Sequence, residues 1–242
     1  MIKPAVMRSF AEAFKPYGFS EKAFNASYGL AENVLAVSFS DSNAGLLVDV
    51  IDKDALEDHR AVPAANETDG RAFVACGKIL PGQRGEIRDE NGVVLGERQV
   101  GRLFIAGDSV MKGYFNNPEG TAEAIKDGWL DTGDLAYWIG DELVIVGRAK
   151  EMLRVGGENV APADIENVLQ THPAVSQAQV VGVPDARMLE VPAAYVVLNP
   201  GAGATEAAST ALSRRPRARS TASMDMVAAR KLPVWPTISP LA

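Results

Sequence analysis

The feature that most constrains the fold is the close spacing of short strand patterns along the first 147 residues. Apolar runs typical of strands lie at residues 46–51, 71–75 and 103–105. Hairpins are predicted at residues 85–95, with a turn at Asn91-Gly92, and at 134–147, with a turn at Gly140-Asp141. Helical patterns are expected at residues 4–16 and 118–126. Many short strands joined by tight turns predict a compact, β-rich unit.

A second, smaller lobe is predicted after Gly147, where the sequence pattern changes. Pro162 begins a helix with Ile165, Val168 and Leu169 on one face, and strand patterns follow at 178–183 and 193–198. Such a lobe would need at least one more helix to cover its sheet, and the sequence does not supply it. We therefore expect a mixed α/β (α+β) fold, with a β-rich part at residues 1–149 and a truncated α/β lobe at residues 150–206.

The last residues, 207–242, are expected to form an irregular basic tail. They contain six Lys and Arg and one acidic residue, Asp225, although the whole chain has a formal net charge of −7. Proline interrupts every candidate helix or strand there. The composition fits translation out of frame, which we prefer, or a disordered tail. The negative charge of the whole chain argues against nonspecific binding to nucleic acid.

The single cysteine, Cys76, cannot form an internal disulfide, which fits a reducing compartment. It lies in an apolar run, so we expect a buried structural thiol rather than a nucleophile. The first residues show no secretory signal, and no apolar run approaches the ~18 residues of a membrane helix. We therefore expect a cytoplasmic protein without a transmembrane segment.

Three short segments join glycine to charged or aromatic residues. In the first, the ring of Tyr28 beside Gly29 would let a flat base lie close to the backbone, and the Glu32 carboxylate could hold Mg²⁺. The alternative is a loop that enters a helix. In the second, Asp134 follows Thr132-Gly133, where a carboxylate could accept hydrogen bonds from vicinal ribose hydroxyls or belong to an Asx turn.

The third segment runs from Gly147 to Glu166. Arg148 could clamp a phosphate or a ribose. Gly156-Gly157 allows a close backbone approach that other residues cannot make. The alternative is a charged linker before an ordinary helix.

In this order, the Tyr-Gly, Thr-Gly-Asp, Gly-Arg-x-Lys and Gly-Gly-Glu-Asn-Val segments resemble the motifs of the adenylate-forming superfamily. That superfamily includes acyl-CoA synthetases, fatty-acyl-AMP ligases, peptide-synthetase adenylation domains and luciferases. The stretch from Gly113 to Thr121 resembles another of its motifs. The resemblance runs from about Met1 to Pro200. It implies the C-terminal part of the large AMP-binding domain, followed by part of the small C-terminal lobe.

The resemblance implies a two-step reaction, in which ATP and a carboxylate give acyl-AMP and pyrophosphate before the acyl group passes to a thiol. It also implies a role for each motif residue. Tyr28 beside Gly29 would stack on adenine, and Glu32 would hold Mg²⁺. Asp134 would bind the ribose hydroxyls, and Arg148 would contact ribose or phosphate. Lys150 would lie at the hinge before the small lobe, and Gly156 and Gly157 would line a pantetheine tunnel. Glu32 and Lys150 are thus the expected catalytic residues.

The substrate class expected from the resemblance is a fatty acid. Pro16-Tyr17-Gly18-Phe19 and the long segment after Ser40 resemble fatty-acyl-AMP ligases, whereas Gly156 to Val160 resembles synthetases that use CoA. The acceptor is therefore CoA or the phosphopantetheine thiol of an acyl carrier protein.

Two parts of the family pattern are not found in the sequence. The 27 residues before Tyr28 contain no Ser/Thr/Gly-rich phosphate loop, and no lysine after a glycine follows Lys150. We therefore expect a fragment of a ligase that is inactive or strongly impaired alone. The alternatives are a non-catalytic nucleotide-binding module that pairs with a separate N-terminal chain, and a gene remnant.

Overall fold

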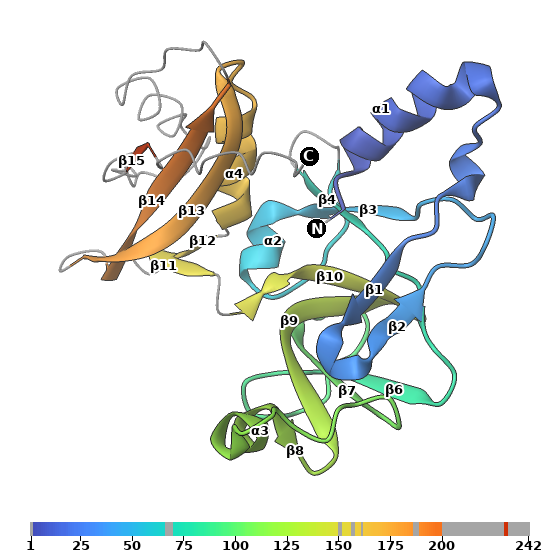
Figure 1. Ribbon diagram of the computed structural model, residues 1–242, viewed down its shortest axis with the longest axis vertical. Coiled ribbons are helices and arrows are strands. Elements are labelled where there is room, and N and C mark those ends of the chain that lie inside the picture. Colours follow the sequence, from blue (N-terminus) through green and yellow to red (C-terminus); the bar gives the residue numbers. More distant parts are fainter. Residues whose placement is uncertain are drawn as a thin grey trace, which may run out of the picture. The chain divides into compact units, whose positions relative to one another are not determined.

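A computed structural model describes residues 2–65, 70–149, 152–155, 158–160, 162–185, 189–199 and 230–231. The chain divides into two compact units, Met1–Lys150 and Glu151–Ala242 (Figure 1). The fold is mixed α/β and rich in strands, as the sequence predicts.

The centre of unit 1 is an antiparallel sheet in the order β10-β9-β7-β6. Its strands are β6 (Gln83–Arg88), β7 (Gly101–Gly107), β9 (Trp129–Ile139) and β10 (Glu142–Arg148), and the short β8 (Ile125–Lys126) pairs with β9. Buried and half-exposed residues alternate along β9, as expected for a strand with one face on the core. The predicted hairpin at residues 134–147 is confirmed by the pairing of β9 with β10. Its turn contains Gly140, which has a φ of 57°.

The hairpin predicted at residues 85–95 is confirmed only next to its turn. Asn91-Gly92 does form a turn, but the returning chain makes one isolated bridge, between Arg88 and Val94. That bridge has two hydrogen bonds, from the Asp89 amide to the Val93 carbonyl at 3.0 Å and from the Leu95 amide to the Ile87 carbonyl at 2.7 Å. On its opposite edge, β6 pairs along its whole length with β7.

Two smaller sheets complete unit 1. β1 (Ser27–Leu30), β2 (Leu35–Phe39) and β5 (Lys78–Ile79) form one antiparallel sheet, and β3 (Val48–Asp52) and β4 (Gly70–Val74) form the other. The predicted strands at 46–51 and 71–75 correspond to β3 and β4. The Tyr-Gly segment lies on β1 and not in a loop that enters an α-helix. Two apolar clusters fill the unit, one around Val37 and Leu103 and the other around Ile51 and Tyr137.

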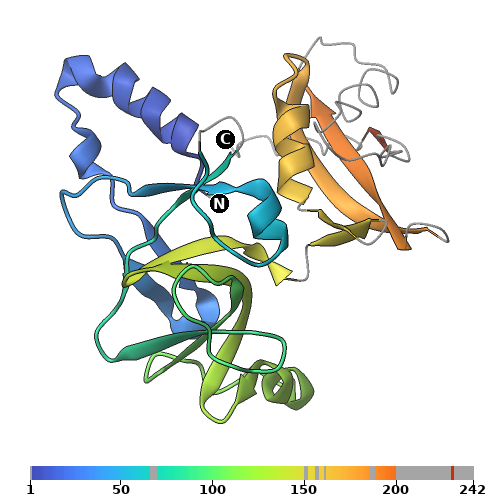
Figure 2. The ribbon, with the colours of Figure 1, turned by 180° about the vertical axis from the view of Figure 1, so that it is seen from behind.

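Three α-helices lie at the periphery of unit 1: α1 (Pro4–Phe14), α2 (Lys53–Glu57) and α3 (Pro118–Ala124). α1 and α3 lie at opposite ends of the unit (Figures 1 and 2). Asn117 caps α3 by accepting a hydrogen bond from the Gly120 amide at 2.8 Å. The 3₁₀ turns are η1 (Lys15–Tyr17), η2 (Glu21–Ala23) and η3 (Ala31–Asn33). In the part of the chain that the structure describes, no helix has the length and apolar character that a membrane crossing requires.

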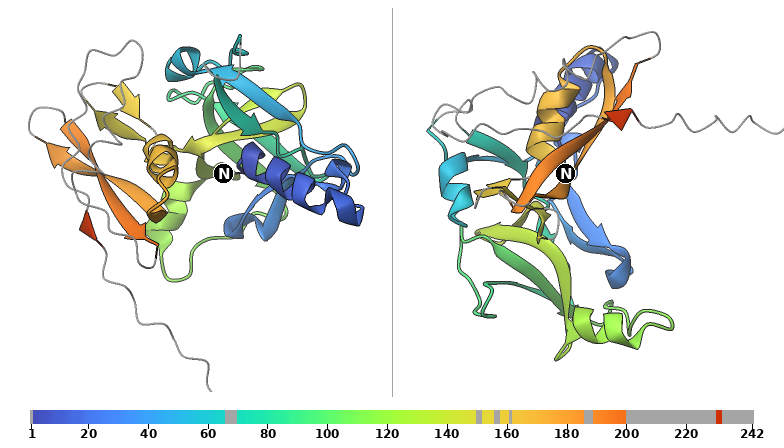
Figure 3. Two further views of the ribbon diagram at one scale, coloured as in Figure 1. Left: turned by 90° about the horizontal axis from the view of Figure 1, so that it is seen from above. Right: turned by 90° about the vertical axis from the view of Figure 1, so that its left-hand side faces the viewer.

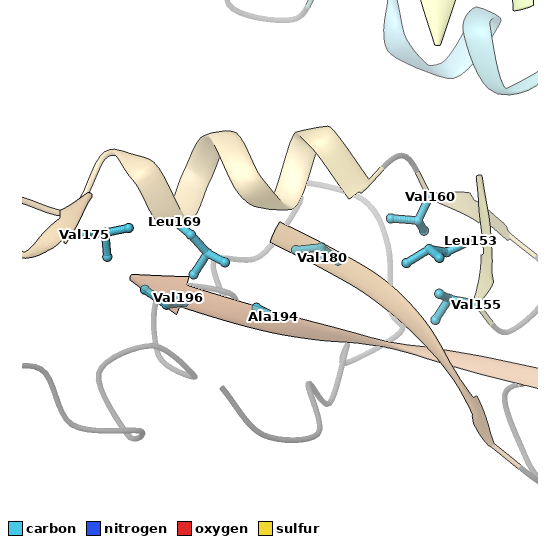
Figure 4. Packing of buried hydrophobic residues seen from close by; sticks show 8 residues of the cluster. All are labelled: Leu153, Val155, Val160, Leu169, Val175, Val180, Ala194 and Val196. Carbon is cyan, nitrogen blue, oxygen red and sulfur yellow. The ribbon is translucent and has the colours of Figure 1, made fainter. Parts of the chain in front are cut away.

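In the part that the structure describes, the second unit is a sheet covered by the helix α4. Its elements are β11 (Leu153–Val155), β12 (Glu158–Val160), α4 (Pro162–Gln170), β13 (Val175–Asp185), β14 (Leu189–Leu198) and β15 (Arg230–Lys231). α4 runs along the β13–β14 pair (Figure 3). Figure 4 shows the side chain of Leu169, which is fully buried, between α4 and the strands. Burial of one such leucine stabilises a fold by about 1.5–3 kcal/mol.

The expectation of an irregular tail needs one correction. Within residues 207–242, Arg230 and Lys231 form the short strand β15, which pairs in parallel with Tyr195 and Val196 of β14. An edge of β14 has unpaired backbone groups, and a returning segment can add to it regardless of its side-chain pattern. This is why an apolar period in the sequence did not predict the strand.

Candidate adenosine site

In unit 1, the Asp134 carboxylate contacts two side chains that come from two other strands. Asp134 lies on β9 directly opposite Arg148 of β10, and Tyr28 comes from β1. The Tyr28 hydroxyl donates to Asp134 Oδ2 at 2.5 Å, and Arg148 Nε lies 3.0 Å from Asp134 Oδ1. The sequence singled out these residues separately. The structure brings them together.

The backbone around Asp134 is held by its own neighbours. The Thr132 hydroxyl donates to the Leu103 carbonyl at 2.9 Å and accepts from the Asp134 amide at 3.1 Å. Gly133 has a φ of +73°, a conformation that favours glycine, and its amide donates to Asp131 Oδ1 at 2.9 Å. The Asx turn considered from the sequence is therefore present, but Asp131 makes it. Asp134 is left to face Tyr28 and Arg148.

Burial differs across this group. The Asp134 side chain is 8% exposed, whereas the Arg148 side chain is 58% exposed. Burial of Tyr28 and the hydrogen bond from its hydroxyl to Asp134 both raise the Tyr28 pKa above its usual value. Tyr28 therefore stays neutral and donates a hydrogen bond to Asp134 over the whole physiological pH range.

Gly29 is required by the shape of the β1–β2 pair. The register of the pair shifts between Tyr28 and Gly29, and a Cβ at Gly29 would overlap the carbonyl oxygen of Leu35. The missing side chain lets the two backbones approach, which fixes where Tyr28 stands.

Glu32 lies just after β1, in the turn η3. Its Oε1 accepts a hydrogen bond from the Tyr114 hydroxyl at 3.0 Å, and its carbonyl accepts one from the Met111 amide at 2.7 Å. Among the described residues, no group of three or more His, Cys, Asp or Glu could hold a metal ion. A cation on the half-buried Glu32 would therefore take its other ligands from nucleotide phosphates and water, which is how Mg²⁺ is often bound. The single carboxylate fits that role.

Three of the predicted site residues cannot be placed. Lys150, Gly156 and Gly157 lie outside the described residues. Their predicted roles as hinge and tunnel residues stay predictions.

Sequence reasoning assigned no role to Thr132 and Tyr114. Thr132 lies within the Thr-Gly-Asp segment. Its position two residues before Asp134 could have indicated its role, because a hydroxyl there can form a hydrogen bond with the backbone. Tyr114 lies in the stretch from Gly113 to Thr121, which was recognised as a motif. Its contact with a residue 82 positions earlier could not be read from the sequence.

The predicted burial of Cys76 is confirmed. The thiol is free, its residue is 7% exposed, and its Sγ lies 3.7 Å from the Val74 carbonyl oxygen. Burial raises the Cys76 pKa to about 11. A thiol with that pKa is a poor nucleophile at neutral pH.

Known families match most of the described chain. The family described as AMP-binding enzyme matches residues 1–115, and the AMP-binding enzyme C-terminal domain matches residues 164–231. The second match extends past Pro200, where the resemblance was expected to end, and reaches β15.

Individual proteins support the same relationship. A Caulobacter vibrioides protein named as an acyl-CoA synthetase is 47% identical over 169 residues, which are 69% of this chain and 30% of that protein. The 4-coumarate–CoA ligase-like 2 of Arabidopsis thaliana is 42% identical over 144 residues, which are 58% of this chain and 26% of that protein.

A solved structure is similar over most of the chain. It comes from a study of fatty acyl-adenylate ligases from E. coli and L. pneumophila, and aligns with a TM-score of 0.74 and 38% identity over 82% of this chain and 36% of that one. The chain spans roughly a quarter to a little over a third of the length of these three proteins.

Proposed function

Since this chain belongs to the AMP-binding enzyme family, we propose that it is the adenosine-holding part of an adenylate-forming carboxylate ligase. The observation that carries the proposal is the shared carboxylate of Asp134, bonded by Tyr28 on one oxygen and by Arg148 on the other. In the proposed reaction, a carboxylate oxygen of the acid attacks the α-phosphorus of ATP and pyrophosphate leaves. A thiol sulfur then attacks the acyl carbon, and AMP leaves.

Ribose would reach Asp134 by replacing the weaker of its two contacts. The Arg148 side chain is 58% exposed, so water can take over its hydrogen bonds, whereas the Asp134 side chain is 8% exposed and needs new donors, which the ribose hydroxyls would supply. The Tyr28 bond is shielded from water and short, so it is the contact that stays. The two ribose hydroxyls would donate to the Asp134 oxygens, and the released guanidinium would contact the ribose or the α-phosphate.

Tyr28 would contribute to the binding of both adenine and ribose. Its hydroxyl is fixed on Asp134, so its ring is held in one orientation. Part of the ring packs against the apolar cluster around Val37 and Leu103. A base that stacked on the remaining face would meet a surface that needs no rearrangement, which lowers the entropy lost on binding.

Glu32 is proposed to hold Mg²⁺, which would neutralise charge on the phosphates when bound. Lys150 is proposed as the hinge before the small lobe, and Gly156 and Gly157 as part of the pantetheine tunnel. We propose a fatty acid as the substrate, supported by the similarity to fatty acyl-adenylate ligases. The acceptor would be the thiol of CoA or of an acyl carrier protein. The chain alone is expected to be strongly impaired in the first step, because it spans only roughly a quarter to a little over a third of the length of its relatives.

Calorimetry with two nucleotides tests the proposal. We expect AMP to bind, and 2′,3′-dideoxy-AMP to bind at least about tenfold more weakly, because each lost hydrogen bond to a charged group is worth about 1.5–3 kcal/mol. Equal affinities for the two nucleotides would show that Asp134 does not bind the ribose hydroxyls. Pyrophosphate exchange with a long-chain fatty acid then asks whether this chain adenylates on its own, and we expect little or none.

A further inference from the structure

Glu32 is held by a loop that lies far from it in the sequence. This loop joins β7 to α3, and it contributes two contacts from two positions. The Met111 amide donates to the Glu32 carbonyl at 2.7 Å, and the Tyr114 hydroxyl donates to the Glu32 carboxylate at 3.0 Å. Backbone and side chain of the same glutamate are therefore both fixed by this loop.

The loop is in turn anchored to α3. The Tyr114 amide donates to the Thr121 hydroxyl at 2.9 Å, and that hydroxyl donates to the Asn117 carbonyl at 2.8 Å. Asn117 also caps the helix and forms a bridge with Tyr114. The position of the Tyr114 ring is thus set by a capped helix rather than by a free loop.

The contact uses one carboxylate oxygen of Glu32. Oε1 accepts from Tyr114, and none of the hydrogen bonds described for the chain occupies Oε2. Tyr114 is 40% exposed, so the carboxylate lies near solvent, where a bound cation could be reached. A carboxylate with one oxygen held and the other open presents that second oxygen in a fixed direction.

We propose that Tyr114 is a positioning residue that aims the free oxygen of Glu32 at the cation on the nucleotide phosphates. The inference rests on the proposed function, because it needs a nucleotide beside Glu32. Tyr114 itself touches neither the nucleotide nor the cation. Its effect passes through Glu32, by removing rotamers in which the free oxygen points away.

The test is calorimetry of ATP binding with and without Mg²⁺, and the quantity read is the ratio of the two affinities. Tyr114→Phe keeps the ring and removes the hydroxyl, and we expect the Mg²⁺ enhancement to fall about three- to tenfold. Glu32→Gln should remove most of the enhancement. In the Glu32→Gln background, Tyr114→Phe should have no further effect. Tyr17→Phe is the matched control, because Tyr17 is 85% exposed, and it should leave the ratio unchanged.

A second variant protects the test against a folding defect. Thr121→Val keeps the Tyr114 hydroxyl and Glu32 but removes the anchor of the Tyr114 amide, so it should lower the enhancement in the same direction. Thermal melts of all variants report whether the fold is kept.

Each contrary result has its own meaning. An unchanged ratio in Tyr114→Phe and Thr121→Val overturns the inference, and so does a loss that persists without Glu32. AMP binding combined with ATP binding that ignores Mg²⁺ also overturns it, while the proposed function stands. Absence of AMP binding overturns the proposed function itself, and the inference falls with it.

Discussion

Removal of the Asp134 carboxylate should destabilise unit 1 by an amount that depends on Tyr28. Asp134→Ala leaves the Tyr28 hydroxyl without its acceptor in a largely buried position. An unsatisfied buried donor costs about 1–3 kcal/mol. The Arg148 pair adds only about 0–1 kcal/mol, because its guanidinium is mostly in water. We therefore expect the free energy of unfolding to fall by about 2 kcal/mol.

The Tyr28→Phe variant separates the contribution of the Tyr28 bond from that of the Arg148 pair. In a Tyr28→Phe background there is no hydroxyl to leave unpaired, so Asp134→Ala should cost only the Arg148 share, about 0–1 kcal/mol. The difference between the two backgrounds is the coupling energy of the Tyr28–Asp134 bond. Asp41→Ala is the surface control, since that carboxylate is 70% exposed and pairs with Lys78 at 3.6 Å. It should change the unfolding free energy by less than about 0.5 kcal/mol.

The assay is urea unfolding followed by tryptophan fluorescence, because Trp129 and Trp138 both lie on β9 in the same unit. For a domain of about 150 residues, a loss of 2 kcal/mol should also lower the melting temperature by about 4–8 °C. Equal costs of Asp134→Ala in the two backgrounds would refute the reasoning, because the buried bond would then contribute nothing.

Three further predictions follow from burial and close contact. Burial and bonds to Asp134 and Asp49 raise the pKa values of Tyr28 and Tyr137, so the folded state keeps protons that the unfolded state loses near pH 10. The contribution of each of these tyrosines to stability should therefore be constant below about pH 10 and fall above it by about 1.4 kcal/mol per pH unit, and Tyr137→Phe should remove one such share from the slope measured in urea titrations. Cys76 should react with a disulfide reagent on the order of 100-fold more slowly in the native protein than in urea, as read by absorbance. Gly29→Ala should cost more than about 3 kcal/mol in urea unfolding, while Gly147→Ala, which has open space around it, should be nearly neutral.

Much of the architecture could be predicted because it follows from local patterns. The predicted hairpin at residues 134–147 corresponds to β9 and β10, and the helix predicted from Pro162 corresponds to α4. β1 and β2 were not predicted. Their strand pattern is short and broken by Gly29, and their position depends on a close approach between backbones that a sequence period does not encode.

The sequence singles out residues of the candidate site one at a time, but it does not predict the contacts between them. Tyr28 and Asp134 are 106 residues apart in the sequence, and Tyr114 and Glu32 are 82 apart. Such contacts arise from the way in which separate sheets pack, so a linear motif carries the residue type without its partner. The sequence accordingly pointed to Tyr28, Glu32 and Asp134 separately, but it did not predict that a tyrosine holds each of the two carboxylates.

A second trio in unit 1 has the same chemistry and a structural role. Tyr137 donates to Asp49 Oδ2 at 2.8 Å, and Arg98 Nη1 donates to the same oxygen at 3.1 Å. Arg98 also donates to the Ala61 carbonyl at 2.9 Å, and Tyr137 is fully buried in an apolar cluster. The arginine and the tyrosine are therefore each fixed by a further contact with the protein interior.

The two trios differ in the exposure and the hydrogen bonding of the arginine. Arg98 is 31% exposed and also donates to the Ala61 carbonyl, so its release from Asp49 would take a second hydrogen bond with it. Arg148 is 58% exposed, and water can replace Asp134 at little cost. A tyrosine, a carboxylate and an arginine in contact do not by themselves make a binding site. The carboxylate becomes available to a ligand only where one of its partners can leave for solvent, and in unit 1 this condition favours Asp134 over Asp49.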